Sequence, residues 1–368
     1  RPSITREEAD AAAEAILSGW LSQGPRVQQF EKTVADYVGA RHGIATSNCT
    51  TALHLALIAS GVGPGDEVIC PSFSFVATAN AIVHAGAKPV FVDIDPRTYN
   101  IDPSLIEAAI TARTRAIVPV DQIGLAADIP TIVEIAWRHG LKVVEDAAPS
   151  LGATFGETRV GATSDFTCFS FHPRKSITTG EGGMITTNDD EAAERLRSLR
   201  SHAASTSDLA RHQSGTTEIE EYRELGFNYR MTDIQAAIGI VQMRRLDGIL
   251  AERARLAARY NELFAGEPRL ETPFVPVGCN HTYQSYCVRL RDTRPRKAIM
   301  NDLAAKGIAS RRGVMAIHLE PYYRAKFPTL NLPATESASA ETLLLPLFAG
   351  MTDAEQDEVV SALVTAVG

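Results

Sequence analysis

Residues 169–183 read Phe169-Ser-Phe-His-Pro-Arg-Lys175-Ser-Ile-Thr-Thr-Gly180-Glu-Gly-Gly183, and they place one lysine between two predicted strands. The aromatic-rich run from Phe166 to Phe171 predicts a short buried strand, and Met184-Ile-Thr-Thr187 predicts the next one. Lys175 therefore follows a strand end, among hydroxyls and glycines. A lysine held there, partly out of water, can be neutral enough to attack a carbonyl carbon and form a Schiff base. The alternative is a solvated surface lysine.

A carboxylate stands at the end of another predicted strand. The run from Lys142 to Val144 is typical of a parallel-sheet strand, and Asp146 follows it. Ligands bind at the carboxyl ends of the strands in open α/β sheets. A carboxylate at this place can pair with a protonated pyridine nitrogen and keep the ring an electron sink. Capping of the next helix is the alternative role for Asp146.

Small polar residues lead into a predicted helix nearer the start of the chain. The segment from Ala45 to Leu57 begins Ala45-Thr-Ser-Asn-Cys-Thr-Thr51 and continues with apolar residues on one helix face. The free N–H groups and the dipole at such a helix start can bind a phosphate. An ordinary N-cap is the alternative for this segment taken alone.

Predicted strands and helices alternate over the first half of the chain. Helices are expected at about 50–60, 75–86, 103–112 and 130–139. This alternation predicts an α/β fold in which helices cover both faces of a largely parallel sheet. The further predicted strands are Glu67–Cys70, Pro89–Asp93 and Ala116–Val120.

The pattern changes towards the C-terminus. A charged helix over 189–200 precedes a polar run from Ser201 to Glu221, whose length favours a lid or an interface loop. Two helices are expected over 231–247 and 250–264. A strand over 283–290 and helices over 296–306 and 353–367 then predict a smaller α+β domain. We therefore expect a large domain over residues 1–250 and a small C-terminal domain over 251–368.

The composition excludes several classes of protein. The chain has 368 residues, 45% of them hydrophobic and 22% charged, which is ordinary for a globular protein with a large core. Its formal net charge is −8 without a long basic cluster, so we expect no nucleic-acid partner. We expect no membrane partner, because there is no long apolar span and no signal peptide. The five cysteines lack C-x-x-C spacing, which argues against a metal site and favours a cytoplasmic protein.

The three sites follow one another as phosphate turn, acid for a ring nitrogen and Schiff-base lysine. In this order, and across essentially the whole chain, the sequence resembles the DegT/DnrJ/EryC1/StrS family of sugar aminotransferases, which have fold type I. The resemblance implies pyridoxal 5'-phosphate as cofactor, with pyridoxamine 5'-phosphate formed during turnover. Besides the three sites, the matching segments are Gly19–Pro25, Pro71–Thr78, Phe91–Asp95 and Leu225–Asp233.

The resemblance implies roles for individual residues. Lys175 matches the lysine that binds the cofactor covalently and later moves a proton between carbon atoms. Asp146 matches the partner of the pyridine nitrogen, and Phe75 matches an aromatic residue that stacks on the ring. The residues at phosphate-binding positions are Cys49, Thr50, Thr51, Ser170 and Asn228. The matching asparagine reaches the phosphate of the neighbouring subunit, which implies a homodimer with shared active sites.

Three more residues are candidates for the substrate side of the site. Arg230 could bind a substrate carboxylate, with a structural salt bridge as the alternative. His318 and Tyr322 could line the substrate entrance, although a lone histidine can equally be a satisfied structural residue. These three assignments rest on the resemblance of the segments that contain them.

Two positions depart from the family pattern. Pro149 stands where the family often has a glutamine that reaches the ring hydroxyl, and proline cannot donate that hydrogen bond. Asp121, in the run from Val118 to Gly124, stands where histidine is common. We expect both positions near the cofactor or substrate, where they could mark a distinct substrate.

The implied activity is a transamination in two stages. L-Glutamate is the expected amino donor, and a keto sugar, in particular a nucleotide-linked keto-deoxy sugar, is the expected acceptor. An aminocyclitol acceptor of the keto-inositol type is an open alternative. So is a non-catalytic regulatory protein that binds the cofactor, although such a protein should lose the lysine or the aspartate, or gain a DNA-binding segment, and the sequence has neither feature.

Overall fold

A seven-stranded sheet forms the centre of the protein. The computed structural model describes residues 2–205 and 221–368, so most of the predicted lid or interface loop lies outside the described residues. The strand order is β1-β9-β8-β5-β4-β2-β3, and neighbours are parallel except β9, which is antiparallel to both β1 and β8. In chain order the strands are β1 His42–Thr46, β2 Glu67–Pro71, β3 Lys88–Val92, β4 Thr114–Ile117, β5 Lys142–Asp146, β8 Phe166–Ser170 and β9 Gly183–Thr187.

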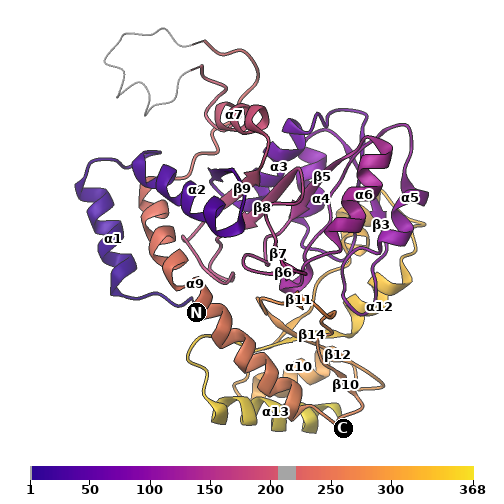
Figure 1. Ribbon diagram of the computed structural model, residues 1–368. Helices are drawn as coiled ribbons and strands as arrows, with labels where there is room; N and C mark the ends of the chain where they lie inside the picture. Colours follow the sequence, from indigo (N-terminus) through magenta and orange to yellow (C-terminus); the bar gives the residue numbers. More distant parts are fainter. Residues whose placement is uncertain (1, 206–220) are drawn as a thin grey trace.

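Helices cover both faces of this sheet (Figure 1). Val143 of β5 packs in one apolar cluster with α5 and α6, whereas Val144 packs in another with α3, α4 and α7. Successive side chains of a strand point to opposite faces, so a strand that is covered on both sides carries apolar residues towards both faces. The helices are α3 Cys49–Ala59, α4 Ala77–His84, α5 Ile106–Ala109, α6 Ile129–His139 and α7 Asp190–Leu199.

A long helix, α9 (Asp233–Leu263), leads from the sheet into the C-terminal part of the chain (Figure 1). The helices α1 (Arg6–Leu17) and α2 (Pro25–Val38) pack against it. The sequence predicted two helices here, over 231–247 and 250–264, and that prediction was wrong. Gly248 lies in open space and continues the helix, at a cost of about 1 kcal/mol relative to alanine. Its apolar neighbours Leu246 and Ile249 are buried, which outweighs that cost.

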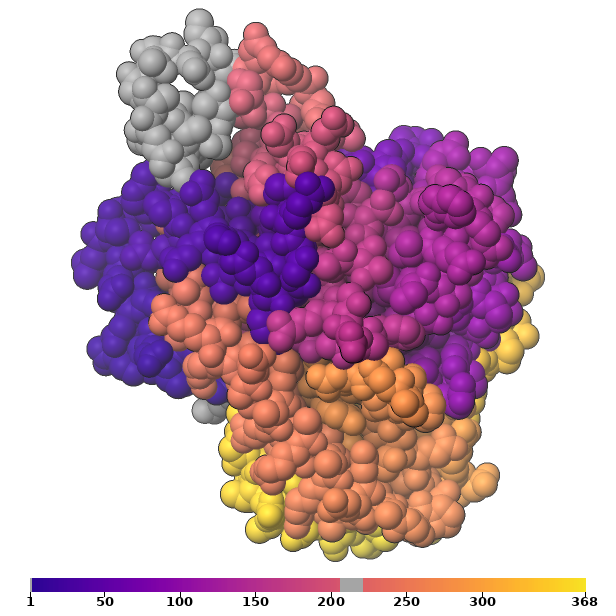
Figure 2. All heavy atoms as spheres, viewed as in Figure 1, coloured from indigo at the N-terminus to yellow at the C-terminus, as the bar shows by residue number. Residues whose placement is uncertain are grey.

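The C-terminal part forms a smaller lobe with its own apolar core, below the large one in Figure 2. Its four-stranded antiparallel sheet has the order β10-β12-β14-β13. The predicted division at residues 250 and 251 falls inside α9 and stays a prediction. The elements of this lobe are β10 Leu270–Glu271, β12 Tyr286–Leu290, α10 Arg296–Ala305, β13 Arg311–Arg312, α11 Pro321–Arg324, α12 Pro333–Glu341, β14 Thr342–Leu345 and α13 Asp353–Val367.

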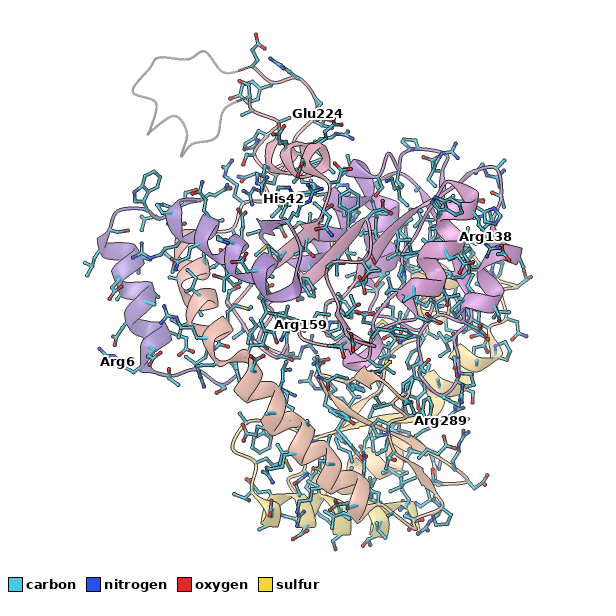
Figure 3. All side chains as sticks on the ribbon, viewed as in Figure 1. Arg6, His42, Arg138, Arg159, Glu224 and Arg289 are labelled. Carbon is cyan, nitrogen blue, oxygen red and sulfur yellow. The ribbon has the colours of Figure 1, made fainter. Side chains whose placement is uncertain are left out.

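Polar contacts tie the small lobe to the ends of the central strands. Arg289 of β12, labelled in Figure 3, donates to the Glu341 carboxylate at 2.6 Å and to the Pro96 carbonyl at 3.3 Å. The backbone N–H of Thr335 in α12 donates to the Asp93 carboxylate at 2.8 Å. Pro96 and Asp93 both follow β3, so the small lobe packs at the carboxyl edge of the sheet.

The fold predicted from the sequence is confirmed as an α/β fold with a mostly parallel sheet and a smaller α+β domain. Strand β1 was not predicted, because its run His42-Gly-Ile-Ala-Thr46 is too poor in large apolar residues to give a clear pattern. Among the described residues, no helix combines the length and the apolar character needed to cross a membrane.

Candidate active site

Strands β2, β5 and β8 and the start of α3 bring the predicted site residues to one edge of the sheet. Asp146 is the last residue of β5, and Ser170 is the last residue of β8. Because β5 and β8 are parallel neighbours, these carboxyl ends lie side by side. Cys49 begins α3, and its thiol donates to the Cys168 carbonyl of β8 at 3.7 Å. The helix start and both strand ends therefore share one site.

The loop that carries Lys175 is fixed by its own hydroxyls. The N–H of Lys175 donates to the His172 carbonyl at 2.8 Å, which turns the chain immediately after β8. The hydroxyl of Thr178 donates to the Phe171 carbonyl at 2.8 Å, and Thr179 donates to the Glu181 carbonyl at 2.7 Å. The two threonines that follow the lysine in the sequence thus hold the backbone of its loop in place.

Lys175 lies in an electrostatic cluster with Asp146 and Cys49. Its side chain is half-buried, and burial lowers the pKa of its ammonium group. The charges of Cys49 and Asp146 act in the opposite direction, whereas that of Arg174 lowers the pKa further. A lowered pKa increases the neutral fraction of the amine, and the neutral amine is the form that attacks a carbonyl carbon.

Asp146 is buried and receives a hydrogen bond that the sequence analysis missed. The hydroxyl of Thr78 donates to its Oδ2 at 2.7 Å, and the N–H of Ala148 donates to its Oδ1 at 3.3 Å. Burial raises the pKa of Asp146, whereas Thr78 and the charge of Lys175 lower it. Thr78 closes the segment Phe75-Val-Ala-Thr78 that carried the resemblance, so its place in that segment was the available signal.

The start of α3 has the chemistry of a phosphate site. Asn48 caps the helix by accepting from the N–H of Thr51 at 3.0 Å, and the Thr51 hydroxyl returns to the Asn48 carbonyl at 2.7 Å. The first N–H groups of a helix have no partner within it. Gly183, the first residue of β9, packs so closely that an added Cβ would lie 2.4 Å from the Asn48 carbonyl oxygen. Thr50, the second residue of α3, is half-buried, and Gly183 packs directly against the residue that caps this helix.

Ser170 and Phe75 stand at the rim of this arrangement. Ser170 is half-buried. Among the described residues, its hydroxyl has a single contact, in which it accepts from the His172 N–H at a long distance of 3.5 Å. Phe75 follows β2 and is 59% exposed, which is unusual for a phenylalanine and leaves its ring face available. Both placements fit the roles predicted for these residues, which stay predictions.

Asn228 and Arg230 lie beside the phosphate turn, where Asn228 is exposed and Arg230 is half-buried. The carbonyl of Tyr229, between them, accepts from the N–H of Ser47 at 2.8 Å. Asn228 is exposed, and the Arg230 side chain has no hydrogen bond or ion pair with any residue that the structure describes. Both side chains are therefore free to meet a group outside this chain.

His318 and Tyr322 differ in their surroundings. His318 is 1% exposed and lies between the Ser72 hydroxyl, at 2.7 Å from Nδ1, and the Glu336 carboxylate, at 3.2 Å from Nε2. This placement fits the structural alternative that the sequence left open. Tyr322 is 55% exposed and has the Lys326 ammonium 4.7 Å from its ring centre, so it can still contact a substrate.

The two departures from the family pattern occupy different places. The Pro149 carbonyl accepts from the Thr282 hydroxyl at 2.9 Å, which fixes the loop after β5 against the small lobe. Asp121 is fully buried and accepts from the Ser150 hydroxyl at 2.6 Å. Asp121 thus lies inside the protein next to β5, where its N–H donates to the Asp146 carbonyl at 3.1 Å, and the expectation that it lies near the cofactor or substrate stays a prediction.

These residues fit pyridoxal 5'-phosphate. The lysine with its lowered pKa suits the aldehyde, the buried carboxylate suits a protonated pyridine nitrogen, and the helix start suits the phosphate. This combination at the carboxyl edge of a mostly parallel sheet defines a pyridoxal-phosphate-dependent transferase of fold type I. The model of the DegT/DnrJ/EryC1/StrS aminotransferase family matches residues 2–364, and the chain belongs to that family.

Known proteins are similar to this chain over nearly its whole length. GDP-perosamine synthase of Caulobacter vibrioides is 44% identical, covering 98% of this chain and 96% of the relative. The spore coat polysaccharide biosynthesis protein SpsC of Bacillus subtilis is 41% identical, covering 98% of this chain and 95% of the relative. Among solved structures, the putative sugar aminotransferase Spr1654 of Streptococcus pneumoniae, in its PMP form, is 30% identical with a TM-score of 0.92. The match covers 100% of this chain and 98% of that one. The protein is thus an aminotransferase that uses pyridoxal phosphate.

Proposed function

We propose that this enzyme transfers the amino group of L-glutamate to the keto group of a nucleotide-linked keto-deoxy sugar. The observation that carries the proposal is the meeting of Lys175, Asp146 and the start of α3 at one sheet edge, in a chain 44% identical to a GDP-perosamine synthase. An aminocyclitol acceptor is the second candidate within the same chemistry. The regulatory alternative is disfavoured, because both groups that the chemistry needs are present and close together.

Pyridoxal phosphate, when bound, supplies the electron sink for the bonds that change at the amino-bearing carbon. The protein positions the reactants and moves the proton. We propose that Lys175 takes the proton from the donor carbon and returns it at another carbon, because its amine stays at the site once it is released. Asp146 holds the proton on the ring nitrogen through its negative charge. Phe75, Thr50 and Ser170 are proposed to orient the ring and the phosphate.

A homodimer is part of this proposal. Asn228 is exposed, Arg230 has no side-chain partner among the described residues, and Leu225 nearby is 84% exposed. An exposed leucine beside an exposed asparagine and an unpaired arginine suits an interface more than open solvent. We propose that these residues enter the site of a second subunit, with Asn228 at the phosphate and Arg230 at the donor carboxylate. We further propose a cytoplasmic location, because all five cysteines are free thiols.

The experiment that tests the function is a visible absorption spectrum of the purified protein with pyridoxal phosphate, before and after L-glutamate. We expect a band from the lysine-linked cofactor that disappears with glutamate and returns with 2-oxoglutarate. The Lys175→Ala variant should fold but lack both the band and turnover. A band that ignores glutamate would contradict the proposed donor. Candidate nucleotide-linked keto sugars and keto-inositols are then compared as acceptors, and conversion of only the latter would favour the alternative.

A further inference from the structure

Two carboxyl groups lie buried together behind the site. Asp121 is 0% exposed and Glu145 is 1% exposed. Glu145 precedes Asp146 on β5 and points to the opposite face of that strand. Asp121 continues the line of β4: its N–H donates to the Asp146 carbonyl at 3.1 Å, and the Asp146 N–H donates to the Pro119 carbonyl at 2.9 Å. Both acids are thus joined to Asp146 through the backbone.

The hydrogen bonds around these acids leave one oxygen without a donor. Asp121 accepts from the Ala127 N–H at 2.8 Å and from the Ser150 hydroxyl at 2.6 Å. Oε2 of Glu145 accepts from the hydroxyls of Ser164 at 2.9 Å and Thr167 at 2.8 Å. Oε1 of Glu145 is buried and receives no hydrogen bond from these neighbours. Such an oxygen is costly unless a further proton faces it.

The other acid can supply that proton. The side chains of Asp121 and Glu145 lie within hydrogen-bonding reach of each other. Burial raises the pKa of Asp121 well above its usual range, and the charge of Glu145 raises it further. Burial also raises the pKa of Glu145, which the hydroxyls of Thr167 and Ser164 oppose. Two buried carboxylates within hydrogen-bonding reach of each other repel strongly, so ionisation of both is disfavoured.

No cation neutralises the two acids. Within the described ranges, 2–205 and 221–368, neither acid forms an ion pair with lysine, arginine or histidine. The other titratable groups that face them are Asp146 on β5 and the Cys168 thiol on β8. Burial raises the pKa of that thiol, so it stays neutral. A proton between the two acids is therefore the available means of lowering their combined charge.

We propose that Asp121 and Glu145 hold one proton between them, carried by Asp121 and donated to Oε1 of Glu145, and that the remaining negative charge of this acid pair favours a protonated cofactor ring nitrogen at Asp146. The two acids are positioning residues, since they act through Asp146. The shared proton is a property of the protein alone. The effect on the ring nitrogen rests on the bound cofactor and is independent of which acceptor the enzyme uses.

The shared proton is tested on the protein without cofactor. In infrared spectra near pH 7 we expect a carbonyl stretch from a protonated carboxyl group, absent in Asp121→Asn, which keeps a neutral donor of the same shape. The native state holds this proton where the unfolded chain has released it, so stability should fall as pH rises above about 4, the ordinary pKa of aspartate. This fall should be smaller in Asp121→Asn, whereas Asp121→Ala should be less stable throughout because Oε1 of Glu145 loses its donor.

The effect on the cofactor is tested with ring-labelled pyridoxal phosphate bound to the enzyme. The double variant Asp121→Asn with Glu145→Gln removes the charge of the pair, and the nitrogen-15 shift of the pyridine ring should then move towards that of the unprotonated ring. An unchanged carbonyl stretch or an unchanged pH dependence of stability in Asp121→Asn would overturn the shared proton. An unchanged nitrogen shift in the double variant would overturn the effect of the pair at Asp146. None of these measurements requires the acceptor, so failure of the proposed function would be separate.

Discussion

At the scale of single residues, Asp146 depends on a chain of two hydroxyls. Thr78 has one hydroxyl proton, and it points to Asp146 at 2.7 Å. The contact of 2.8 Å between the hydroxyls of Ser74 and Thr78 must therefore have Ser74 as its donor. All three residues are buried, so the orientation of these protons is fixed by the fold. The carboxylate that should hold the ring nitrogen is thus supported in its ionised form.

Replacing Thr78 by valine should weaken cofactor binding. The change preserves the shape of the side chain but removes a hydrogen bond to a charged group, a loss that corresponds to about ten-fold or more in affinity. Without the donor, the pKa of Asp146 should rise further above its usual value, because Thr78 lowers it. The measurement is an absorption titration with pyridoxal phosphate. Thr78→Ser, which keeps the hydroxyl, is the control, and equal affinity of the valine variant and the native protein would contradict the role of Thr78.

At the scale of elements, the joint between β9 and α3 explains why glycine follows the lysine loop. An added Cβ at Gly183 would lie 2.4 Å from the Asn48 carbonyl oxygen and 2.6 Å from the Thr46 hydroxyl. Gly183→Ala should therefore move β9 away from the helix start, lower the free energy of unfolding by roughly 1–3 kcal/mol and weaken cofactor binding. Thermal and chemical unfolding and the cofactor titration measure both effects.

The same substitution elsewhere serves as the control. Gly248 lies within α9 and has nothing within 4 Å of an added Cβ. Gly248→Ala should leave cofactor binding unchanged and raise stability by up to about 1 kcal/mol, since alanine has the higher helix propensity. If the two alanine variants behaved alike, close packing at Gly183 could not be the reason for its glycine.

The docking of α1 on α9 should depend on pH through Glu8. Its carboxylate accepts from Gln242 at 2.6 Å and Arg245 at 2.7 Å, both on α9, and from the Thr5 hydroxyl at 2.6 Å. Burial raises its pKa, but these hydrogen bonds prevail and lower the pKa to about 2. A lowered pKa stabilises the folded state above the ordinary value of 4.5, and this contribution is lost as pH falls towards 2.

Glu8→Gln should accordingly destabilise the protein by up to roughly 3 kcal/mol at pH 7. The difference from the native protein should shrink as pH falls through the range between 4.5 and about 2. Denaturant unfolding at pH 7 and pH 3 measures it, with the exposed neighbour Glu7→Gln as control. A difference that stays constant with pH would show that packing, and not the charge of Glu8, is responsible.

Elements with a strong local pattern were the ones that could be predicted. The helix over 353–367 was predicted with its exact bounds, because Thr352 caps it and apolar residues recur along one face. The break expected in α9 was wrong, because the burial of Leu246 and Ile249 outweighs the low helix propensity of Gly248 between them. At the site, a strand end can be predicted for Asp146, but its Thr78 donor and the burial of Asp121 are tertiary facts. No local pattern predicts them.

At the scale of the whole molecule, the described chain gathers most of its site residues at one edge of the sheet and leaves Asn228 exposed and Arg230 without a side-chain partner among the described residues. In a closed dimer with two-fold symmetry, each subunit would present these residues to the active site of the other. The same geometry would account for the exposed Leu225 in the segment that leads to Asn228. Whether Asn228 acts in its own subunit or in the neighbouring one can be decided by mixing two inactive variants.

Lys175→Ala and Asn228→Ala should each have little or no activity as pure proteins. A mixed dimer contains one site with the lysine of one subunit and the asparagine of the other, and that site is complete only if Asn228 acts across the interface. After subunit exchange at equal amounts, half the dimers are mixed, so activity should return to about a quarter of the native value. A different affinity tag on each variant shows, by purification on one tag and detection of the other, that mixed dimers have formed. No recovery despite exchange would place Asn228 with the lysine of its own chain, and would contradict the shared site.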